Sequence, residues 1–343
     1  MESVGNEMIP KLRSKRILVT GAAGLVGSSL IDLLLEINRT FGADIEIWAL
    51  GRQKSVLESR FSSHLHSALK FHMIEGDVNR VVLPSVGFDY IVHAASPAHP
   101  LAYSQTPVDV MKANLTGTIN LLELAKDTGA RLLFISSGEI YGISDREDSA
   151  FQESDYGFIE ITNPRSCYPE SKRAAETLCA SYHAQYGVDT VIARLCHVYG
   201  PSITERNSRA DAQFLRNVID QTDIVMKSPG TQVRSFCYVK DAVTGLLYIL
   251  LSGTACEAYN VANKNSVATI REYAETLALS GGVKIRDEFP PEVEARGYSP
   301  VSRAVLDAAK LEALGWRPKY SLKDGIADML ALNQACAGLF PPK

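Results

Sequence analysis

Tyr168 and Lys172 have the residue types and the spacing of a proton-transfer pair. They lie four residues apart in "CYPESKRAAE", so a helix that begins near Pro169 would present both on one face. A phenol has an ordinary pKa of about 10, and a nearby ammonium lowers that pKa because it favours the phenolate. Ser137, at the end of an expected strand, would hydrogen-bond the hydroxyl of a substrate. Together these three residues could remove a proton from an alcohol while a hydride leaves its carbon for a nicotinamide.

The residues that follow Ser137 indicate whether chemistry beyond alcohol oxidation is expected. The stretch "ISSGEIYG" places the carboxylate of Glu139 two residues after Ser137. Gly138, between them, has no side chain with which to donate a proton. Because a simple alcohol oxidation needs no carboxylate at this place, Glu139 predicts a further chemical step.

A glycine-rich turn stands near the start of the chain, in "TGAAGLVG" at 20–27. It follows an expected strand and opens an expected helix. Glycine lets the backbone approach a pyrophosphate closely, and the helix N-terminus supplies N–H donors and positive potential. The pattern therefore predicts a dinucleotide site formed by Gly21, Ala23, Gly24, Leu25, Val26 and Gly27.

The residues at the end of the second expected strand help to decide whether NAD or NADP is bound. Strands that bind NAD often end in an acid that bonds the ribose hydroxyls, but this chain reads Leu50-Gly51-Arg52. Arg52 could meet the 2′-phosphate of NADP or could be a solvated loop residue, so both NAD and NADP stay open. Asp77, after the third expected strand, is a candidate partner for the adenine amino group.

The elements that must position these residues alternate through the first half of the chain. Short apolar, β-branched runs predict strands at 16–21, 45–50, 71–77, 89–95, 131–137 and 189–195, and the apolar spacing at 25–37 predicts a helix. Near-continuous apolar strands that alternate with helices are typical of a parallel sheet covered on both faces. We therefore expect an α/β fold, a Rossmann-type doubly wound parallel sheet.

The alternation breaks down near Cys196, where the elements become shorter and the loops richer in proline, glycine and polar residues. We expect 1–195 to form the NAD(P)-binding domain, with later segments at about 236–262 returning to it. The remainder of 196–343 is expected to form mainly a smaller C-terminal substrate lobe at the carboxyl edge of the sheet, where ligands bind in such folds.

The composition argues against several classes of partner. The net charge is −4 and no dense basic run occurs, which argues against nucleic acid. No apolar run is long enough for a membrane span, and the polar start lacks the apolar segment of a secretory signal, so we expect a cytoplasmic protein.

We also expect no metal site. The six cysteines are scattered without CxxC spacing, which argues against zinc and against a disulfide framework. His64-x-His66 has no acidic or cysteine partner at ligand spacing and is interpreted as part of a solvated loop.

With the glycine turn, Ser137 and the Tyr168/Lys172 pair in place, the chain resembles the extended short-chain dehydrogenase/reductase family, in its nucleotide-sugar-modifying branch. The resemblance extends from about Arg16 to Leu332. It implies a C-terminal lobe that binds a nucleotide sugar and transient oxidation of that sugar at C4 by bound NAD(P), with tightly bound NAD slightly favoured.

Within that branch the chain looks most like the UDP-glucuronate decarboxylases. They carry patterns similar to "HAASPAHPLAY" at 93–103, "NLTGTINLLELAK" at 114–126, "NPRSCYPESKRAAET" at 163–177 and "VRSFCYVKDAV" at 233–243. The resemblance implies that Glu139 is a catalytic carboxylate. It implies cofactor contacts at Val78, Ala94, Ala95, Ser96 and Asn114, the last with a structural role as the alternative, and substrate contacts at Pro97, Arg165, Arg209 and Arg234, of which Arg209 and Arg234 would meet the diphosphate.

The tripeptide 137–139 departs from the family's pattern. The family's decarboxylases have Thr-Ser-Glu there and its 4,6-dehydratases have Thr-Asp-Glu, where the aspartate helps the C6 hydroxide leave. Gly138 therefore argues against the dehydratase. A 4-epimerase stays open, because 4-epimerases tolerate a small middle residue although they usually lack the glutamate.

Two other functions and the assembly state also stay open. An NADPH-dependent keto-sugar reductase is an alternative that Arg52 favours, and a dinucleotide-sensing protein without catalysis is a further one. The resemblance suggests a homodimer through the helix around 108–126 and the Tyr168 helix, although the same apolar stripes would also cover a sheet.

Overall fold

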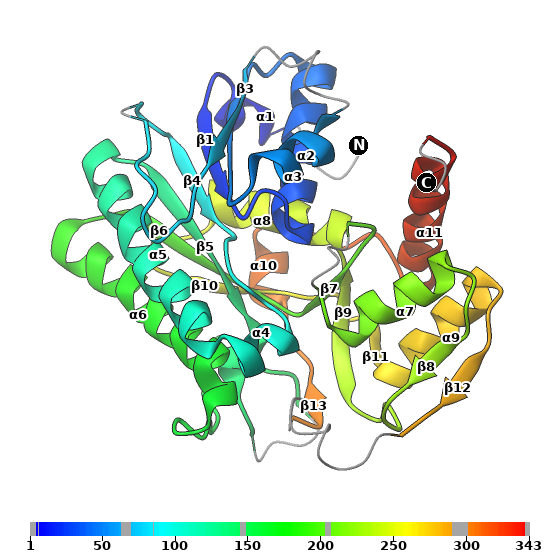
Figure 1. Cartoon of the computed structure of the whole chain (residues 1–343). Coiled ribbons are helices and arrows are strands. Elements are labelled where there is room, and N and C mark those ends of the chain that lie inside the picture. The colour runs from blue at the N-terminus through cyan, green and yellow to red at the C-terminus, as the bar shows by residue number, and fades with distance from the viewer. Residues whose placement is uncertain are drawn as a thin grey trace.

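A computed structural model of the chain describes residues 5, 7–62, 70–84, 86–144, 149–202, 207–289 and 301–339, with side chains as far as 333 (Figure 1). His64 and His66 lie outside the described residues. None of the helices in these ranges is both long enough and apolar enough to cross a membrane.

A seven-stranded parallel sheet forms the larger part of the molecule, with the strand order β10-β6-β5-β4-β1-β2-β3. Its strands are β1 (Arg16–Thr20), β2 (Glu46–Gly51), β3 (Phe71–Glu75), β4 (Tyr90–His93), β5 (Arg131–Ser137), β6 (Thr190–Leu195) and β10 (Ala258–Val261). The six predicted strands are all present and the predicted fold class is confirmed. The chain runs outward in opposite directions from β1 and β4, so the order reverses between these two strands, which is where such sheets bind ligands.

Helices cover both faces of this sheet. On one face lie α5 (Pro107–Thr128) and α6 (Cys167–Tyr186), and on the other lie α2 (Leu25–Phe41) and α8 (Val239–Ser252). The strands show the reason, because alternate residues enter different cores: Leu132 and Phe134 pack with α5 and α6, while Leu133 and Ile135 pack on the opposite face. Of the shorter helices, α3 (Lys54–Arg60) packs against β2 and β3, whereas α1 (Ile9–Leu12) lies by the end of α8, where Lys11 Nζ donates to the Leu251 carbonyl over 3.0 Å.

The second part of the chain builds a smaller lobe beside the carboxyl edge of the sheet (Figure 1). Its strands are β7 (His197–Tyr199), β8 (Ile224–Met226), β9 (Val233–Tyr238), β11 (Val267–Thr269), β12 (Ile285–Asp287) and β13 (Arg303–Ala304), and its helices are α7 (Ala210–Ile219), α9 (Ile270–Gly281) and α11 (Leu322–Leu339). β9 pairs with β7, β11 and β13, whereas β8 pairs with β12.

The chain passes between the two parts more than once. β9 belongs to the small sheet, but α8 and β10, which follow it, return to the large one, and α10 (Ala309–Ala313) packs against β10. Three short helices, α4 (Pro100–Gln105), η2 (Gly138–Tyr141) and η3 (Pro164–Ser166), stand where the strands of the large sheet give way to the lobe. The two parts are thus tied together around the carboxyl edge.

Candidate active site

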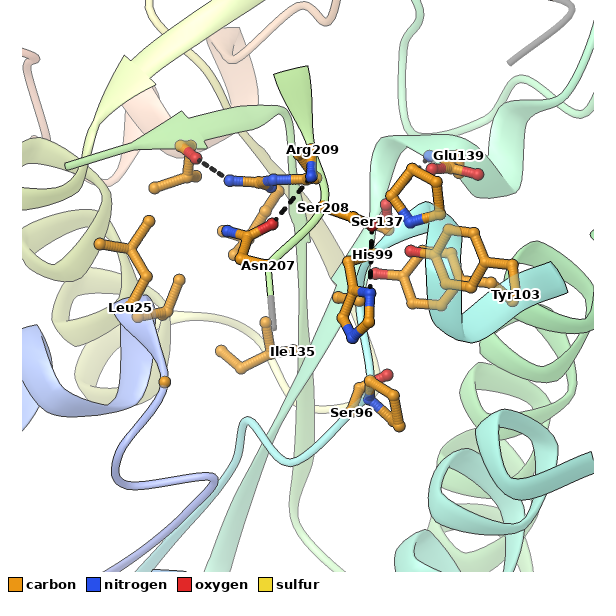
Figure 2. A pocket seen from close by; sticks show the side chains of 18 of the residues that line it. Leu25, Ser96, His99, Tyr103, Ile135, Ser137, Glu139, Asn207, Ser208 and Arg209 are labelled. Atoms are coloured by element: carbon orange, nitrogen blue, oxygen red, sulfur yellow. Dashed lines mark hydrogen bonds between the residues drawn. The ribbon is translucent and has the colours of Figure 1, made fainter. Parts of the chain in front are cut away.

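A cavity of about 1990 Å³ runs along the carboxyl edge of the large sheet and continues into the lobe. Its wall includes the glycine turn, the ends of β2, β4 and β5, the first turn of α6, and residues of α7, β8 and β9. Figure 2 shows Ser137, Glu139 and Tyr103 on one side of this space and Leu25 and Arg209 on the other. All the residues predicted for the site lie on this wall except Asn114.

The glycine turn has the shape that a close phosphate contact requires. Gly21 has φ +66°, and a Cβ there would lie 2.6 Å from the carbonyl oxygen of Ala94. A Cβ on Gly27 would lie 2.4 Å from the carbonyl oxygen of Gly21. Only glycine fits at these two positions, so the turn packs closely against the end of β4 and against the start of α2, whose N-terminus can then face a phosphate. This cradle fits the pyrophosphate of a dinucleotide, and Gly24, Leu25 and Val26 line it as well.

The β2 and β3 ends continue this wall on one side of the turn. The backbone N–H of Ala22 donates to the carbonyl of Leu50 over 3.1 Å, which holds the end of β2 against the turn. Arg52, Asp77 and Val78 all line the cavity here. Asp77 accepts the backbone N–H of Asn79 through Oδ1 at 3.0 Å, so one of its oxygens already stabilises its own loop.

The β4 end forms the wall on the other side, with Ala94, Ala95, Ser96 and Pro97. The N–H of Ala95 donates to Thr20 Oγ1 over 3.2 Å, and Thr20 Oγ1 lies 2.9 Å from His93 Nδ1. Burial, with a smaller contribution from the Lys172 charge, lowers the pKa of His93 to about 3, so this imidazole is neutral. Ser96 Oγ is buried and has no hydrogen-bond partner among the described residues, so it can bind a ligand in the cavity.

Ser137, Tyr168 and Lys172 come together because β5 ends beside the first turns of α6. Ser137 accepts the N–H of Glu139 through Oγ at 3.1 Å, and its hydroxyl lies close enough to Tyr168 to lower the pKa of that phenol. Lys172 Nζ donates to the carbonyl of Ile135 over 2.7 Å and lies 5.9 Å from the centroid of the Tyr168 ring. The arrangement places a phenol, a hydroxyl and an amine on one patch of the cavity wall.

Burial controls the ionisation of this group. It raises the pKa of Tyr168 to about 12, with the Glu139 charge acting in the same direction, while the hydrogen bond with Ser137 and the charges of Arg209 and Arg165 lower that pKa. Burial also lowers the pKa of Lys172 to about 7, against the opposing effect of Glu176. The sequence predicted a phenol pKa lowered by the neighbouring ammonium, and this is wrong for the chain by itself, because desolvation raises the pKa by more than Ser137, Arg209 and Arg165 lower it.

Glu139 belongs to a stack of side chains beside the catalytic tyrosine candidate. Arg165 Nη2 donates to Glu139 Oε2 over 2.9 Å, and the Arg165 guanidinium carbon lies 4.5 Å from the centroid of the Tyr103 ring. Tyr103 in turn stacks on Tyr168 with ring centroids 4.8 Å apart. Tyr103 is thus a site residue that the sequence analysis did not single out, although it closes the quoted stretch at 93–103.

Leu306 occupies the space beside Gly138. A Cβ on Gly138 would lie 3.0 Å from Leu306 Cδ1 and 3.2 Å from Cδ2, and the Leu306 side chain is buried. A residue larger than glycine at 138 would therefore be crowded by this leucine, whose side chain would have to shift by a few tenths of an ångström. No sequence pattern signalled the contact, since the two residues are far apart in the chain.

The two arginines expected at the diphosphate differ in their surroundings. Arg209 donates through Nη2 to the Val198 carbonyl at 2.9 Å and to Asp211 Oδ2 at 3.0 Å. Burial alone would raise the pKa of Asp211, but the Arg209 guanidinium and His197 hold it well below its usual range. Arg234 donates only to backbone carbonyls among the described residues, including that of Val301 at 2.8 Å, and burial lowers its pKa. Arg234 therefore retains the less neutralised charge.

Asn114 lies off the cavity wall. Its Nδ2 donates to Ser171 Oγ over 2.8 Å, which joins α5 to α6 directly behind Tyr168. This contact fits the structural alternative for Asn114. The cofactor-side role that the resemblance implied for Asn114 stays a prediction.

The described residues contain no group of three or more His, Cys, Asp or Glu that could hold a metal ion. Five cysteines within these ranges are free thiols, of which Cys167, Cys179 and Cys237 are buried.

Comparisons with known proteins agree on the kind of protein that has this site. A family model described as the NAD dependent epimerase/dehydratase family matches residues 17–262. UDP-glucuronic acid decarboxylase 3 of Arabidopsis thaliana is 35% identical over 314 residues, covering 91% of this chain and 86% of that protein. UDP-glucuronic acid decarboxylase 1 of Xenopus tropicalis is 34% identical over 314 residues, covering 91% of this chain and 70% of that protein.

The solved structures have the same fold. The dTDP-glucose 4,6-dehydratase DesIV of Streptomyces venezuelae, crystallised with NAD, superposes with a TM-score of 0.80 at 26% identity, covering 95% of this chain and 99% of that one. The UDP-glucuronic acid 4-epimerase of Bacillus cereus, in complex with UDP-glucuronic acid and NAD, has a TM-score of 0.78 at 23% identity, covering 94% of this chain and 99% of that one.

Proposed function

The chain belongs to the NAD dependent epimerase/dehydratase family, the extended short-chain dehydrogenases/reductases, and from this premise we propose that it decarboxylates a UDP-linked hexuronate such as UDP-glucuronate. The observation that carries the proposal is the placement of Glu139 and its partner Arg165 beside Tyr168 and Ser137. An alcohol oxidiser needs only the tyrosine, the serine and the lysine. The ion pair between Glu139 and Arg165 gives the site an acid–base group that could act in a second step on the same sugar.

The first step is the oxidation of the sugar C4 hydroxyl. The nicotinamide dinucleotide, when bound in the glycine cradle, supplies a reversible acceptor for the C4 hydride. Tyr168 Oη takes the proton of the C4 hydroxyl, and Ser137 Oγ hydrogen-bonds the same oxygen. Arg209 and Arg165 favour the phenolate form of Tyr168, against the effect of burial.

The second step is the loss of the C5 carboxylate. Once C4 is a ketone, the carboxyl group is β to a carbonyl, so its bond to C5 can break and CO₂ can leave. The electron pair of that bond enters the enolate of the C4 ketone, and C5 then takes a proton. Glu139, oriented by Arg165 and close enough for its charge to affect Tyr168, is proposed to hold the water that delivers this proton. Return of the stored hydride to C4, with Tyr168 giving its proton back to the C4 oxygen, would then yield a UDP-pentose and leave the dinucleotide oxidised again.

Cationic side chains in the cavity suit an anionic substrate. Arg234 and Arg209 reach the wall from β9 and from the start of α7, on the lobe side. We assign them to the diphosphate, because guanidinium groups bind phosphate oxygens in pairs. The lobe would then bind the nucleotide sugar while the 1–195 domain and the returning 236–262 segments bind the dinucleotide.

We propose a homodimer as the assembly. Val108, Met111 and Ile119 are exposed along one stripe of α5, at spacings of three and eight residues. A second copy that packs on this face would cover the stripe.

The experiment that tests the function is turnover of nucleotide sugars without added cofactor. The purified chain is incubated with UDP-glucuronate and, separately, with UDP-, dTDP-, GDP- and CDP-linked neutral sugars, and the products are identified by NMR. We expect CO₂ and a UDP-pentose from UDP-glucuronate alone. Turnover that requires stoichiometric NADPH would instead identify a keto-sugar reductase, and no turnover of any sugar under either condition would overturn the proposal.

A 4-epimerase is the second candidate, because of Gly138. The glycine removes a polar side chain from the centre of the 137–139 turn and Leu306 fills the space, which leaves a less polar wall at this point. In the same assay an epimerase would convert UDP-glucuronate into its C4 epimer and release no CO₂.

A further inference from the structure

The end of β2 is the part of the cavity wall that would face the adenosine ribose of a dinucleotide. Ala22 N donates to Leu50 O over 3.1 Å, so this strand end is tied directly to the glycine turn. Gly51, Arg52, Ser55 and Ser59 line the cavity here. Side chains at this place distinguish the free 2′-hydroxyl of NAD from the 2′-phosphate of NADP.

The β2 end carries no carboxylate that could bond the ribose hydroxyls of NAD, and a side chain there would be crowded. The strand ends in Gly51, and a Cβ there would lie 3.0 Å from Leu57 Cδ2 and 3.1 Å from Leu57 Cγ. Leu57 is completely buried, so an aspartate at 51 would need this packed side chain to shift by a few tenths of an ångström. The packing of Leu57 at this end of the cavity therefore suits a residue without a side chain at position 51.

Glu75, the acid on the neighbouring strand, does not supply the missing carboxylate. Glu75 pairs in register with Gly51 on β3, but its Oε1 accepts the backbone N–H of Lys54 at 3.1 Å and the residue does not line the cavity. It holds the first turn of α3 in place.

What the wall does present here is a cation and two hydroxyls. Arg52 is exposed and lines the cavity, and it has no hydrogen-bond or ion-pair partner within the described ranges. Arg60, the other arginine at this end, is already bound by Asp32. Ser55 and Ser59 are four residues apart on α3, which follows Arg52 in the chain, and both line the cavity, so their hydroxyls lie on one face of that helix.

We propose that Arg52, assisted by Ser55 and Ser59, binds the 2′-phosphate of the adenosine ribose, and that the chain prefers NADP to NAD. A guanidinium binds two phosphate oxygens at once, and the serine hydroxyls can donate to the third. This inference rests on the dinucleotide site of the proposed function and goes beyond it, since the solved relatives described above were crystallised with NAD.

The test measures binding, so it does not depend on the sugar substrate. The purified chain, freed of bound nucleotide, is titrated calorimetrically with NADP⁺ and NAD⁺, and with the fragments adenosine 2′,5′-bisphosphate and adenosine 5′-monophosphate. We expect the 2′-phosphorylated member of each pair to bind about tenfold tighter or more. Arg52→Ala should bring each pair close to equality while leaving the affinity for NAD⁺ nearly unchanged.

Lys54→Ala is the matched control, because Lys54 is a neighbouring exposed cation that pairs with Glu58 at 3.7 Å and does not line the cavity. It should leave the preference intact, and an equal loss in this variant would overturn the assignment to Arg52. Equal affinity of the unmodified chain for both members of each pair would overturn the NADP preference while leaving the dinucleotide site in place. If neither dinucleotide binds, the proposed function itself fails.

Discussion

At the scale of single residues, the ionisation of Tyr168 is the central question for catalysis. The chain buries the phenol, and burial raises its pKa to about 12. Ser137 and the arginines Arg209 and Arg165 act in the opposite direction. Under the proposed function, Tyr168 becomes a base only when the cations and hydrogen bonds of the cavity favour its phenolate, which would link substrate and cofactor binding to proton transfer.

Tyr168→Phe should lower turnover of UDP-glucuronate by about 10² to 10⁴-fold, since it removes the proton acceptor. Dinucleotide affinity should stay close to that of the unmodified chain, because the ring that stacks on Tyr103 is retained. Rates are measured by product NMR and affinity by calorimetry. Tyr182→Phe is the control, since Tyr182 lies on the same helix outside the cavity and binds Glu123. A turnover rate near that of the unmodified chain would remove Tyr168 from the mechanism.

Glu139→Gln should separate the two proposed steps. The amide keeps the shape of the side chain but loses the charge that pairs with Arg165 at 2.9 Å. We expect C4 oxidation to persist, seen as absorbance of reduced nicotinamide on adding UDP-glucuronate, while CO₂ release falls by at least about tenfold.

The matched control for this change is Glu170→Gln, which removes a carboxylate of α6 that pairs with Arg173 at 3.3 Å outside the cavity. It should leave both signals unchanged. If Glu139→Gln abolishes nicotinamide reduction as well, then Glu139 acts before or during C4 oxidation and the assignment to the second step is wrong.

At the scale of elements, the turn that joins β5 to η2 is fitted to the segment that follows β13. Ser137 ends the strand, and Leu306 packs against Gly138 from the other part of the molecule. The backbone N–H of Leu306 donates to Ser235 Oγ over 3.1 Å, which holds this segment on β9. The shape of the 137–139 turn thus depends on the lobe as well as on the strand that leads into it.

Gly138→Ser should therefore destabilise the chain by about 1 to 3 kcal/mol through overpacking against Leu306. Leu306→Ala should cost about 2 to 5 kcal/mol by leaving a cavity. In the double variant the serine has room, so the loss should be smaller than the two single losses added together by about 0.5 kcal/mol or more. Urea unfolding of the four proteins measures this cycle, and strictly additive losses would contradict the packing argument.

At the scale of the whole molecule, the site exists only where the two parts meet. The large sheet contributes the glycine turn, Ser137 and the Tyr168 helix, whereas the lobe contributes Arg209, Arg234 and Leu306. The return of α8 and β10 to the large sheet ties the parts together and leaves the cavity along their junction. α5, on the face of the sheet opposite α2 and α8, carries the apolar stripe that we assign to the proposed dimer.

Ile119→Asp should weaken the proposed dimer, because it places a charge in the apolar stripe of α5, where Ile119 is 38% exposed. Sedimentation equilibrium should show a shift towards monomer at a concentration where the unmodified chain is dimeric. Ile219→Asp is the control, since Ile219 is 44% exposed on α7 in the lobe. A monomeric unmodified chain, or equal dissociation in both variants, would contradict a dimer through α5.

The sequence by itself determined the parts whose pattern is local. Strand runs, the glycine turn and the four-residue spacing of Tyr168 and Lys172 follow from side-chain period and backbone sterics, so they could be predicted without knowing what lies opposite them. The fold class follows from the same alternation of strands and helices. For that reason the predicted strands and their order of appearance agree with the structure.

Only the tertiary structure decided what stands next to these residues. The Glu139–Arg165 pair, the Tyr103 stack on Tyr168 and the Leu306 contact at Gly138 join segments far apart in the chain. The position of Asn114 also depends on tertiary packing, because α5 packs on α6 and brings its side chain to Ser171. The ionisation of Tyr168 also depends on burial, which no local pattern records. Local sterics act within a few residues, whereas burial and contact arise only when distant segments pack together.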